Sequence, residues 1–294
     1  MVVEPLIVGL LLAAALMHAS WNAILKSDQS DRLATFGVIM TTGTVMGLCA
    51  VPFLPWIEPG AWKFLAISVI VHVAYYTFLL KAYSYGDLSH TYPIARGLGP
   101  LLVALVSGRV IGEHLRVQDI GGVVLLSFGL IALAMPLKPV AGRAAGRHGL
   151  ATLFAVLTGV TIAAYIIADG MGVRSAGPDF EHRLAYIAWL CVLEGPWLLV
   201  LAMVLRPETV LSHLKRHWWR GVIGGLIANT GYGIAIYALV LGPMAHVAAL
   251  RETSVLFGAL MGTLLLGEPF GLRRVAAAFV IVSGLVLMNG PALF

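Results

Sequence analysis

The chain has 294 residues, of which 60% are hydrophobic and only 11% are charged, and its formal net charge is +5. Soluble domains carry about 25% charged residues, so this composition excludes an ordinary soluble enzyme or binding domain. The basic residues lie mostly in short connections between long apolar runs, as in membrane proteins, so we expect no nucleic-acid partner. The two cysteines, Cys49 and Cys191, form neither a metal-binding spacing nor a disulfide framework.

Ten apolar runs follow one another along the chain, each close to the length of about 20 residues that crosses ~30 Å of hydrocarbon as a helix. We predict spans at residues 5–26, 33–54, 61–83, 88–111, 117–137, 149–170, 184–205, 219–241, 244–266 and 272–292. The expected fold class is therefore an all-α membrane protein in the plasma (inner) membrane. Because no basic region precedes the first run, we expect it to be a span and not a cleaved signal.

Several spans carry aromatic and polar side chains three or four residues apart, which places them on one face of a helix. Stripes of this kind, facing one another, would form the wall of a small-molecule site. Helix packing or an interfacial position is the alternative for each residue. The side chains that we expect to bind a substrate are Trp21, Asn22, His72, Tyr75, Tyr76, Tyr92, Arg96, Tyr165, Asn229, Tyr232, Arg251 and Ser254.

Two arginines lie inside apolar runs, Arg96 in the fourth span and Arg251 in the ninth. An arginine at the centre of a membrane helix costs roughly 2.5–3.5 kcal/mol on insertion scales, so it marks a candidate functional site. A guanidinium offers permanently charged, bidentate donors, which suit a carboxylate or another anionic group of a substrate. The alternative is structural, with each arginine satisfying backbone carbonyls or a neighbouring carboxylate.

Three acids lie within or close to spans. Glu252 adjoins Arg251, but neighbouring residues of a helix point in different directions, so Glu252 needs a partner of its own or a proton. Glu194 lies in mid-span beside Gly195, whereas Asp169 lies near a helix end, where we expect it to be solvated. Glu252 and Glu194 are therefore the candidates for carrying a coupling proton, and a structural salt bridge is the alternative.

The chain repeats itself at an offset of 155 or 156 residues. Tyr76, Gly86, His90, Arg96, Gly112, Glu113 and Gly129 match Tyr232, Gly242, His246, Arg251, Gly267, Glu268 and Gly284 in that order. A unit of five helices crosses the membrane an odd number of times, so its second copy enters from the opposite side. We therefore predict two inverted repeats, residues 1–140 and 141–294, which bring Arg96 and Arg251 toward the midplane from opposite faces.

Lysine and arginine residues in the connections predict the orientation. The side that bears both termini has five of them, and the other side has twelve. Because cytoplasmic loops carry the excess of basic residues, this distribution places both termini outside the cytoplasm.

Two five-helix repeats, each with a Gly-Glu turn before its last helix and a glycine midway along that helix, resemble the EamA-type drug/metabolite transporters. The resemblance covers essentially the whole chain and includes the stretches His18-Ala-Ser-Trp-Asn22 and Arg251-Glu-Thr-Ser254. It implies a secondary exporter of amino acids or other small metabolites. From the two repeats we expect alternating access, in which they rock about a central site. We expect no cofactor, and a monomer is the form that we expect.

The YddG-type aromatic amino-acid exporters are one neighbouring group within this resemblance. Their fourth span carries a Tyr-Leu-Trp-Pro run, whereas this chain has Arg96-Gly-Leu-Gly99-Pro100, which departs from aromatic specificity. Such proteins are commonly drawn with both termini in the cytoplasm, opposite to the orientation that the loop charges predict here.

Two rival functions differ from amino-acid export. An exporter of drugs or lipophilic cations with the same fold would depend on an acid, Glu252 or Glu194, more than on the arginines. A non-transporting membrane enzyme or assembly subunit would gather its polar residues near one interface. The chain has no phosphate-binding glycine loop, no HExxH pair and no GxSxG turn, so we expect neither catalysis nor a bound metal.

Overall fold

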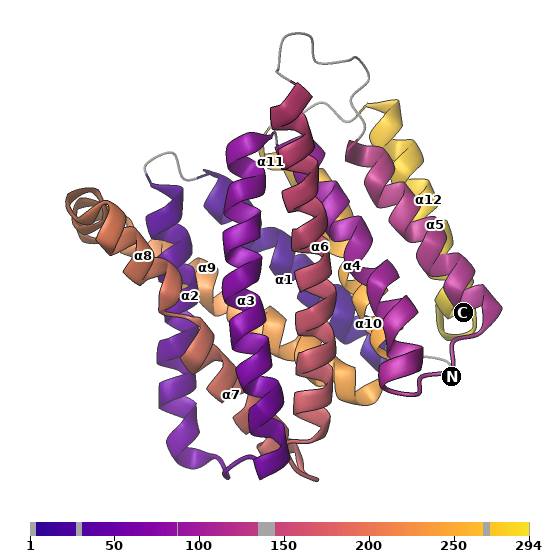
Figure 1. Cartoon of the computed structure of the whole chain (residues 1–294), viewed down its shortest axis with the longest axis horizontal. Coiled ribbons are helices and arrows are strands. Elements are labelled where there is room, and N and C mark those ends of the chain that lie inside the picture. The colour runs from indigo at the N-terminus through magenta and orange to yellow at the C-terminus, as the bar shows by residue number, and fades with distance from the viewer. Residues whose placement is uncertain (1–3, 28–30, 87, 135–144, 267–270, 294) are drawn as a thin grey trace.

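The computed structural model describes residues 4–27, 31–86, 88–134, 145–266 and 271–293 (Figure 1). Within these ranges the chain is helical, with one short 3-10 turn at Val51–Phe53 and no β-strand. The helices are α1 (Pro5–Ser27), α2 (Arg32–Ala50), α3 (Pro59–Tyr85), α4 (Leu88–Val110), α5 (Val117–Ala134), α6 (Ala145–Arg174), α7 (Phe180–Glu194), α8 (Trp197–Leu205), α9 (Pro207–Leu241), α10 (Met244–Arg251), α11 (Thr253–Leu266) and α12 (Leu272–Leu293).

These helices make the ten crossings that the apolar runs predict, so the all-α membrane fold class is confirmed. Seven of the described stretches are long and apolar enough to span a membrane by length and composition, with α7 and α8 forming one of them. The apolar parts of α5 and α12 are shorter. Together α10 and α11 make the ninth crossing.

Two of the predicted spans are interrupted in the structure. The seventh divides into α7 and α8 at Gly195 and Pro196, because proline has no N–H to continue the helical hydrogen-bond ladder. The ninth divides at Glu252, whose backbone N–H bonds to the carbonyl of Ala249 at 3.1 Å in a tighter turn. Both interruptions place an acid, Glu194 or Glu252, at the end of a half-helix deep in the protein.

Helix α9 begins at Pro207, well before the start that hydropathy predicts at residue 219. Its first turns pack Val210 against α2 and α8, and His213 hydrogen-bonds Thr35 at 2.9 Å. Charged residues in this segment, such as Lys215, lower its hydropathy without breaking the helix. The helix was therefore predicted to start too late.

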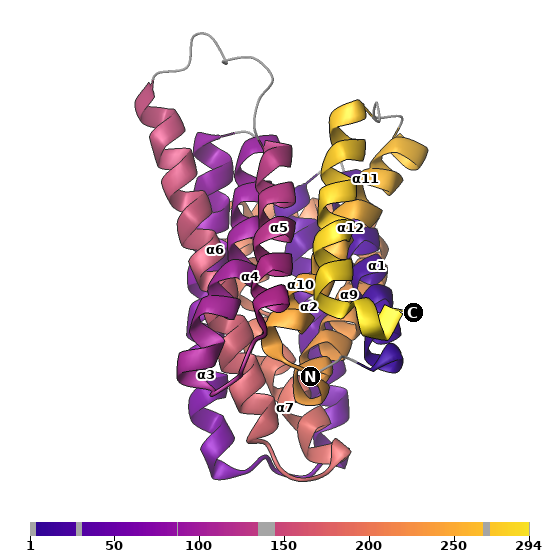
Figure 2. The ribbon, with the colours of Figure 1, turned by 90° about the vertical axis from the view of Figure 1, so that its right-hand side faces the viewer.

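The helix packing has the exchanged symmetry of two inverted repeats. Helix α3 of the first repeat packs on α6 of the second, and α1 packs on α9 in the corresponding way. The last helices of the two repeats, α5 and α12, stand side by side (Figure 2). Both chain ends lie on the same side of the molecule (Figure 1). The whole arrangement confirms the two-repeat fold.

The glycine midway along the last helix of each repeat allows α5 and α12 to approach closely. A Cβ on Gly284 would lie 2.6 Å from the carbonyl oxygen of Gly122 and 2.8 Å from the backbone nitrogen of Leu126. Only a residue without a side chain fits at this crossing, as is typical of tightly packed membrane helices.

Some sequence predictions fall outside the described residues. These are the division of the chain between residues 140 and 141 and the second Gly-Glu turn, Gly267 and Glu268. The predicted orientation of the termini stays a prediction.

Candidate functional site

Arg96 reaches from α4 into the middle of the bundle, where its side chain is almost fully buried. Its Nε lies 2.9 Å from Oε2 of Glu252, and its Nη2 donates a hydrogen bond to Ser254 Oγ at 3.2 Å. The ring of Tyr92 lies 5.9 Å from the guanidinium carbon. Glu252 and Ser254 belong to the second repeat, so this ion pair joins the two halves. It also supplies the partner that Glu252 needs.

Arg251 is the counterpart of Arg96 in the second repeat, but its surroundings differ. It is the last residue of α10, and its guanidinium carbon lies 5.4 Å from the centre of the Tyr232 ring. Among the described residues it has no ion-pair or hydrogen-bond partner for its side chain. Glu252, its neighbour in sequence, is held by Arg96. Arg251 therefore presents a half-buried, permanently charged donor group with unused hydrogen-bonding capacity.

The two arginines meet at a small cavity in the centre of the bundle. Its volume is about 20 Å³, which is room for about one water molecule. The lining residues are Ala14, Ala15, His18, Arg96, Ala228, Gly231, Tyr232 and Arg251. Small residues on α1 and α9 open this space, and the charged groups reach it from α4 and α10.

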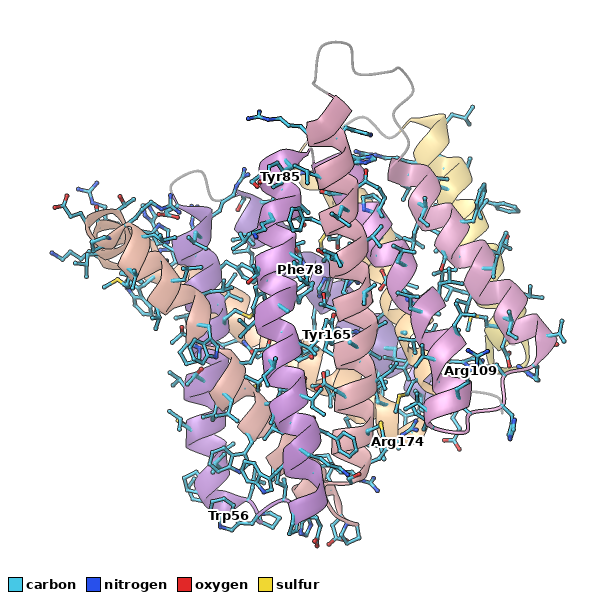
Figure 3. All side chains as sticks on the ribbon, in the orientation of Figure 1. Trp56, Phe78, Tyr85, Arg109, Tyr165 and Arg174 are labelled. Carbon is cyan, nitrogen blue, oxygen red and sulfur yellow. The ribbon has the colours of Figure 1, made fainter. Side chains whose placement is uncertain are left out.

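A wall of stacked aromatic rings adjoins the cavity. His72 stacks on Tyr165 with 4.3 Å between ring centres, and Tyr75 meets Tyr165 edge-on at 5.7 Å. Tyr232 lies 6.5 Å from Tyr165 and continues the wall to Arg251. The structure thus brings together the predicted side chains of α3, α6 and α9. The mid-height position of Tyr165 is visible in Figure 3.

A second aromatic chain reaches the same region from α1. Trp21 stacks on Phe36 at 5.7 Å, and Phe36 meets Tyr76 edge-on at 5.9 Å. Sequence reasoning missed Phe36, because a single phenylalanine in an apolar helix has no distinguishing pattern.

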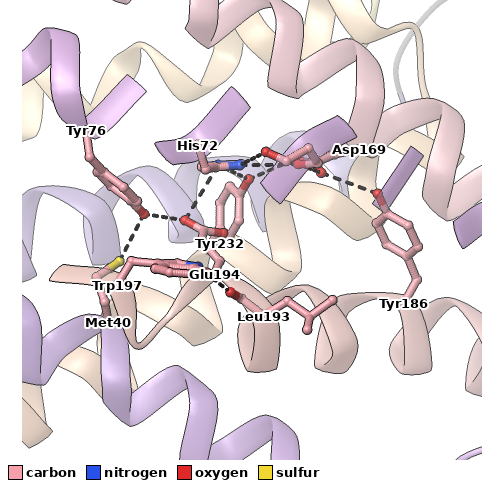
Figure 4. A network of polar contacts seen from close by, with 10 residues as sticks. Met40, His72, Tyr76, Asp169, Tyr186, Leu193, Glu194, Trp197 and Tyr232 are labelled. Atoms are coloured by element: carbon pink, nitrogen blue, oxygen red, sulfur yellow. Dashed lines mark hydrogen bonds and ion pairs between the residues drawn. The ribbon is translucent and has the colours of Figure 1, made fainter. Parts of the chain in front are cut away.

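Hydrogen-bonded acids lie directly behind the aromatic wall (Figure 4). The Tyr232 hydroxyl donates to Asp169 Oδ2 at 2.7 Å and lies 3.0 Å from His72 Nε2. Ser68 donates to Asp169 Oδ1 at 2.5 Å. Glu194 accepts a hydrogen bond from Tyr76 and lies 3.6 Å from His72 Nε2. We call His72, Asp169, Glu194 and Tyr232 the acid–histidine network.

The position of Asp169 corrects an expectation. It is 1% exposed and receives hydrogen bonds from Ser68, Tyr232 and Tyr186 on three other helices, so it is not a solvated residue of a helix end. Its spacing of four residues from Tyr165 was the sequence signal that places it on the cavity side of α6.

Of the twelve predicted side chains, only Arg96, Tyr232 and Arg251 line the cavity itself. Three of the others belong neither to the cavity nor to the wall of rings around Tyr165. The Asn229 amide donates to the carbonyls of Ile39 and Gly225, at 3.1 and 2.7 Å, and so ties α9 to α2. Asn22 donates to the carbonyl of His18 at 2.8 Å, within its own helix. Trp21 forms part of the aromatic chain from α1. Their polar groups are used within the protein in this structure.

The first Gly-Glu turn closes the end of the molecule that bears the termini. Gly112 has a positive φ of 75°, which favours glycine. Glu113 accepts from the backbone N–H of Met244 at 3.0 and 3.1 Å, and Arg174 donates to it at 3.0 Å. A carboxylate at the N-terminus of α10 caps its free N–H groups and complements its dipole. The motif therefore binds one repeat to the start of the other's half-helix.

A second contact at this end involves Asp119 at the start of α5. Arg116 binds its carboxylate at 2.8 Å, and His246 of α10 lies 3.4 Å away. The hydrogen bond to Asp119 raises the pKa of Arg116. The two contacts together hold α5 and α10 at the same end.

Tryptophan side chains gather at the outer end of α3 and α7. The rings of Trp56, Trp62 and Trp189 lie 5.4–6.1 Å from one another. Trp56, labelled in Figure 3, is 73% exposed. This cluster is typical of the aromatic belt at a membrane–water interface, far from the central cavity. Among the described residues no cluster of three or more histidine, cysteine or acidic side chains is arranged to hold a metal.

Comparison with known families gives a match over both halves. The sequence model of the EamA-like transporter family matches residues 5–135 and 149–290. A solved crystal structure superposes with a TM-score of 0.73 over 98% of this chain and 96% of its own, at 17% identity, which supports the fold.

Relatives in sequence are distant. An uncharacterized protein of Pseudomonas aeruginosa is 28% identical over 253 residues, covering 80% of this chain and 75% of that protein. An uncharacterized transporter of a Sinorhizobium species is 27% identical over 139 residues, 47% of this chain and 91% of its own. A chloroplastic WAT1-related protein of Arabidopsis thaliana is 23% identical over 197 residues, which are 65% of this chain. The aligned part covers 46% of that relative, so the chain spans about half of its length.

Proposed function

This chain belongs to the EamA-like transporter family and is a multi-pass membrane transporter, and we propose that it exports amino acids or other small metabolites bearing an anionic group across the plasma (inner) membrane. The observation that carries this proposal is Arg251. It holds a permanent charge beside a central cavity without a carboxylate partner among the described residues. A charge at this depth marks a site for a substrate or ion.

The substrate's anionic group binds Arg251 through charge-assisted, bidentate hydrogen bonds. Arg96 contributes less, because Glu252 already neutralises it at 2.9 Å. The aromatic rings of Tyr232 and Tyr165 receive the apolar part of the substrate, and a substrate ammonium faces the same rings. Glu252 acts here as the partner of Arg96 and not as the group that receives the ammonium.

Alternating access between the two sides gives this site its transport cycle. The cavity has room for about one water molecule, so a metabolite needs the two repeats to move apart. At the end bearing the termini, Glu113 and Asp119 hold the repeats together. Helix α4 packs along α5, whereas the described parts of α11 and α12 contact each other little. This asymmetry supports access from the opposite end, between α11 and α12.

Export of lipophilic cations is the second candidate. It is favoured by Asp169 and Glu194, two buried carboxylates next to an aromatic wall. In that case the acids bind the substrate and Arg251 is dispensable.

Uptake into proteoliposomes distinguishes the two functions. The panel contains neutral amino acids, organic anions and lipophilic cations, each with and without a pH gradient. We expect amino acids or anions to accumulate and Arg251→Ala to abolish this, with exposed Arg147→Ala as the matched control that keeps it. Accumulation of cations alone, unaffected by Arg251→Ala, contradicts the proposal.

A further inference from the structure

The hydroxyl of Tyr232 has two hydrogen-bond partners in the acid–histidine network but only one hydrogen. It lies 2.7 Å from Asp169 Oδ2 and 3.0 Å from His72 Nε2. A tyrosine hydroxyl donates one hydrogen and accepts through its lone pairs. If it donates to one partner, the other partner must supply the hydrogen for the second bond.

The second nitrogen of His72 decides which hydrogens are available. His72 Nδ1 lies 2.9 Å from the backbone carbonyl oxygen of Ser68, which is an acceptor only. It also lies 3.2 Å from Ser68 Oγ, but the single hydrogen of that hydroxyl is donated to Asp169 Oδ1, so Ser68 Oγ can only accept from Nδ1. Nδ1 therefore carries a hydrogen. A neutral imidazole has one N–H, so Nε2 of neutral His72 has none and is itself an acceptor.

With a neutral His72 and an ionised Asp169, both partners of the Tyr232 hydroxyl are acceptors, and one of the two contacts is unmade. Both bonds form only when the network holds one additional proton. That proton is either on His72 Nε2, which then donates to Tyr232, or on Asp169 Oδ2, which donates while Tyr232 donates to His72. The other acid, Glu194, lies 3.6 Å from Nε2 and stabilises the first form.

We infer that the acid–histidine network is a binding site for one proton and that Tyr232 couples this site to the anion site at Arg251. This inference rests on the proposed function, since it assigns the coupling ion of the same transport cycle. When the proton leaves, Tyr232 loses one of its two hydrogen bonds. The ring of Tyr232 is the surface over which Arg251 lies at 5.4 Å, so the loss is transmitted directly to Arg251.

Charge gives the sign of the coupling. The deprotonated network has one more negative charge than the protonated one, and this charge competes with the substrate anion for Arg251. Proton and anion therefore favour each other's binding, and the substrate binds more weakly as pH rises. The proton moves in the same direction as the anion, so export runs down the substrate's own gradient.

Other titratable or charged groups face the network from each helix packed around it. They are Tyr75 and Tyr76 of α3, Tyr165 of α6, Tyr186 and Cys191 of α7, and Arg251 of α10. Of these, only Arg251 carries a permanent charge. It is therefore the group through which an anionic ligand is sensed.

Asp169→Asn is the direct test. The amide Nδ2 donates to Tyr232, Tyr232 donates to neutral His72, and Oδ1 still accepts from Ser68, so the variant imitates the protonated network without a removable proton. In wild type we expect substrate affinity to fall roughly tenfold or more between acidic and alkaline pH, and the variant to lose this dependence. The exposed Asp179→Asn serves as the matched control and keeps it. A variant that keeps the pH dependence of wild type overturns the inference.

Transport gives a second readout. In proteoliposomes, anion movement should carry protons in the same direction in wild type, measured with a trapped pH-sensitive dye. Tyr232→Phe keeps the ring under Arg251 but removes the hydroxyl, so we expect fewer protons to move per anion than in wild type, at whatever rate of anion movement remains. Proton movement opposite to the anion, or unchanged in Tyr232→Phe, contradicts the coupling.

A third measurement needs no substrate and so separates this inference from the proposed function. Infrared difference spectra of the reconstituted protein between acidic and alkaline pH should contain one carboxyl or imidazolium signal that both Asp169→Asn and His72→Gln remove. If neither variant changes the spectrum, the proton site is wrong even where a substrate is transported. If the signal is present and no panel compound is transported, the proposed function fails and the proton site stands.

Discussion

Arg96 and Arg251 occupy equivalent positions in two inverted repeats, yet they have different partners. Arg96 is paired with Glu252 at 2.9 Å and bonded to Ser254, both from the other repeat. Arg251 faces the cavity and the ring of Tyr232 without a carboxylate. One acid between two arginines thus creates a structural ion pair and a free charge. A repeated residue in a symmetric fold can therefore have two functions.

The largest expected effect comes from breaking the ion pair. Glu252→Ala leaves the buried Arg96 guanidinium without a carboxylate to neutralise it, which costs about 3–5 kcal/mol for a buried pair. We expect a large loss of thermal stability in detergent. Replacing both residues, as in Arg96→Met with Glu252→Met, should restore most of it. If Glu252→Ala alone is as stable as wild type, Arg96 does not depend on Glu252 for its charged partner.

Arg251→Ala should have the opposite profile. It removes a charge that no ion pair holds, so we expect a stability change of only about 1 kcal/mol or less, the contribution of its contact with the Tyr232 ring. Substrate binding should weaken by about 1.5–3 kcal/mol, the contribution of hydrogen bonds to a charged group. Thermal unfolding tests the expected effect on stability, and equilibrium binding on the same preparation tests the expected effect on affinity. Severe destabilisation would show that Arg251 is as structural as Arg96.

The close contact between α5 and α12 depends on Gly284. Gly284→Ala places a Cβ against the backbone of α5, and overpacking of this kind costs typically about 1–3 kcal/mol. Gly121→Ala is the matched control, because its Cβ would lie 3.5 Å from Leu287, an ordinary contact. Unfolding in detergent measures both. Equal stability of the two variants would mean that α5 and α12 do not cross as closely as described.

The smallest expected effect concerns the end that Glu113 closes. Glu113→Gln keeps the shape of the side chain but weakens its contacts with Arg174 and with the backbone N–H of Met244. Loss of a helix N-cap costs about 1 kcal/mol. We expect faster hydrogen exchange at the start of α10, with little change near Arg251. Unchanged hydrogen exchange at the start of α10 would show that Glu113 does not hold the two repeats together at this end.

Much of the architecture follows from local sequence properties. Hydropathy places the ten crossings, because a helix across hydrocarbon needs a run of apolar residues wherever it occurs. The repeat predicts the inversion. The start of α9 was predicted too late, because the exposed Lys215 and Arg216 lower the hydropathy of a continuous helix.

The site is less accessible from the sequence, because its partners come from distant helices. Nothing near Glu252 in the chain indicates that Arg96, 156 positions earlier, is its ion-pair partner. Asp169 lies near the end of α6, yet it accepts hydrogen bonds from Ser68, Tyr232 and Tyr186, which belong to three other helices. Helical spacing predicts which face of a helix is polar, but the neighbour of that face depends on tertiary packing.

Discrimination between an amino acid and its amide tests the central claim most directly. The amide lacks the carboxylate, so its affinity relative to the amino acid measures what the anion site contributes. We expect wild type to prefer the amino acid by roughly tenfold or more, as the strength of a charge-assisted hydrogen bond implies. Arg251→Ala should abolish this preference. If the preference survives in Arg251→Ala and disappears when Arg96 and Glu252 are replaced together, the roles assigned to the two arginines are reversed and the account is wrong.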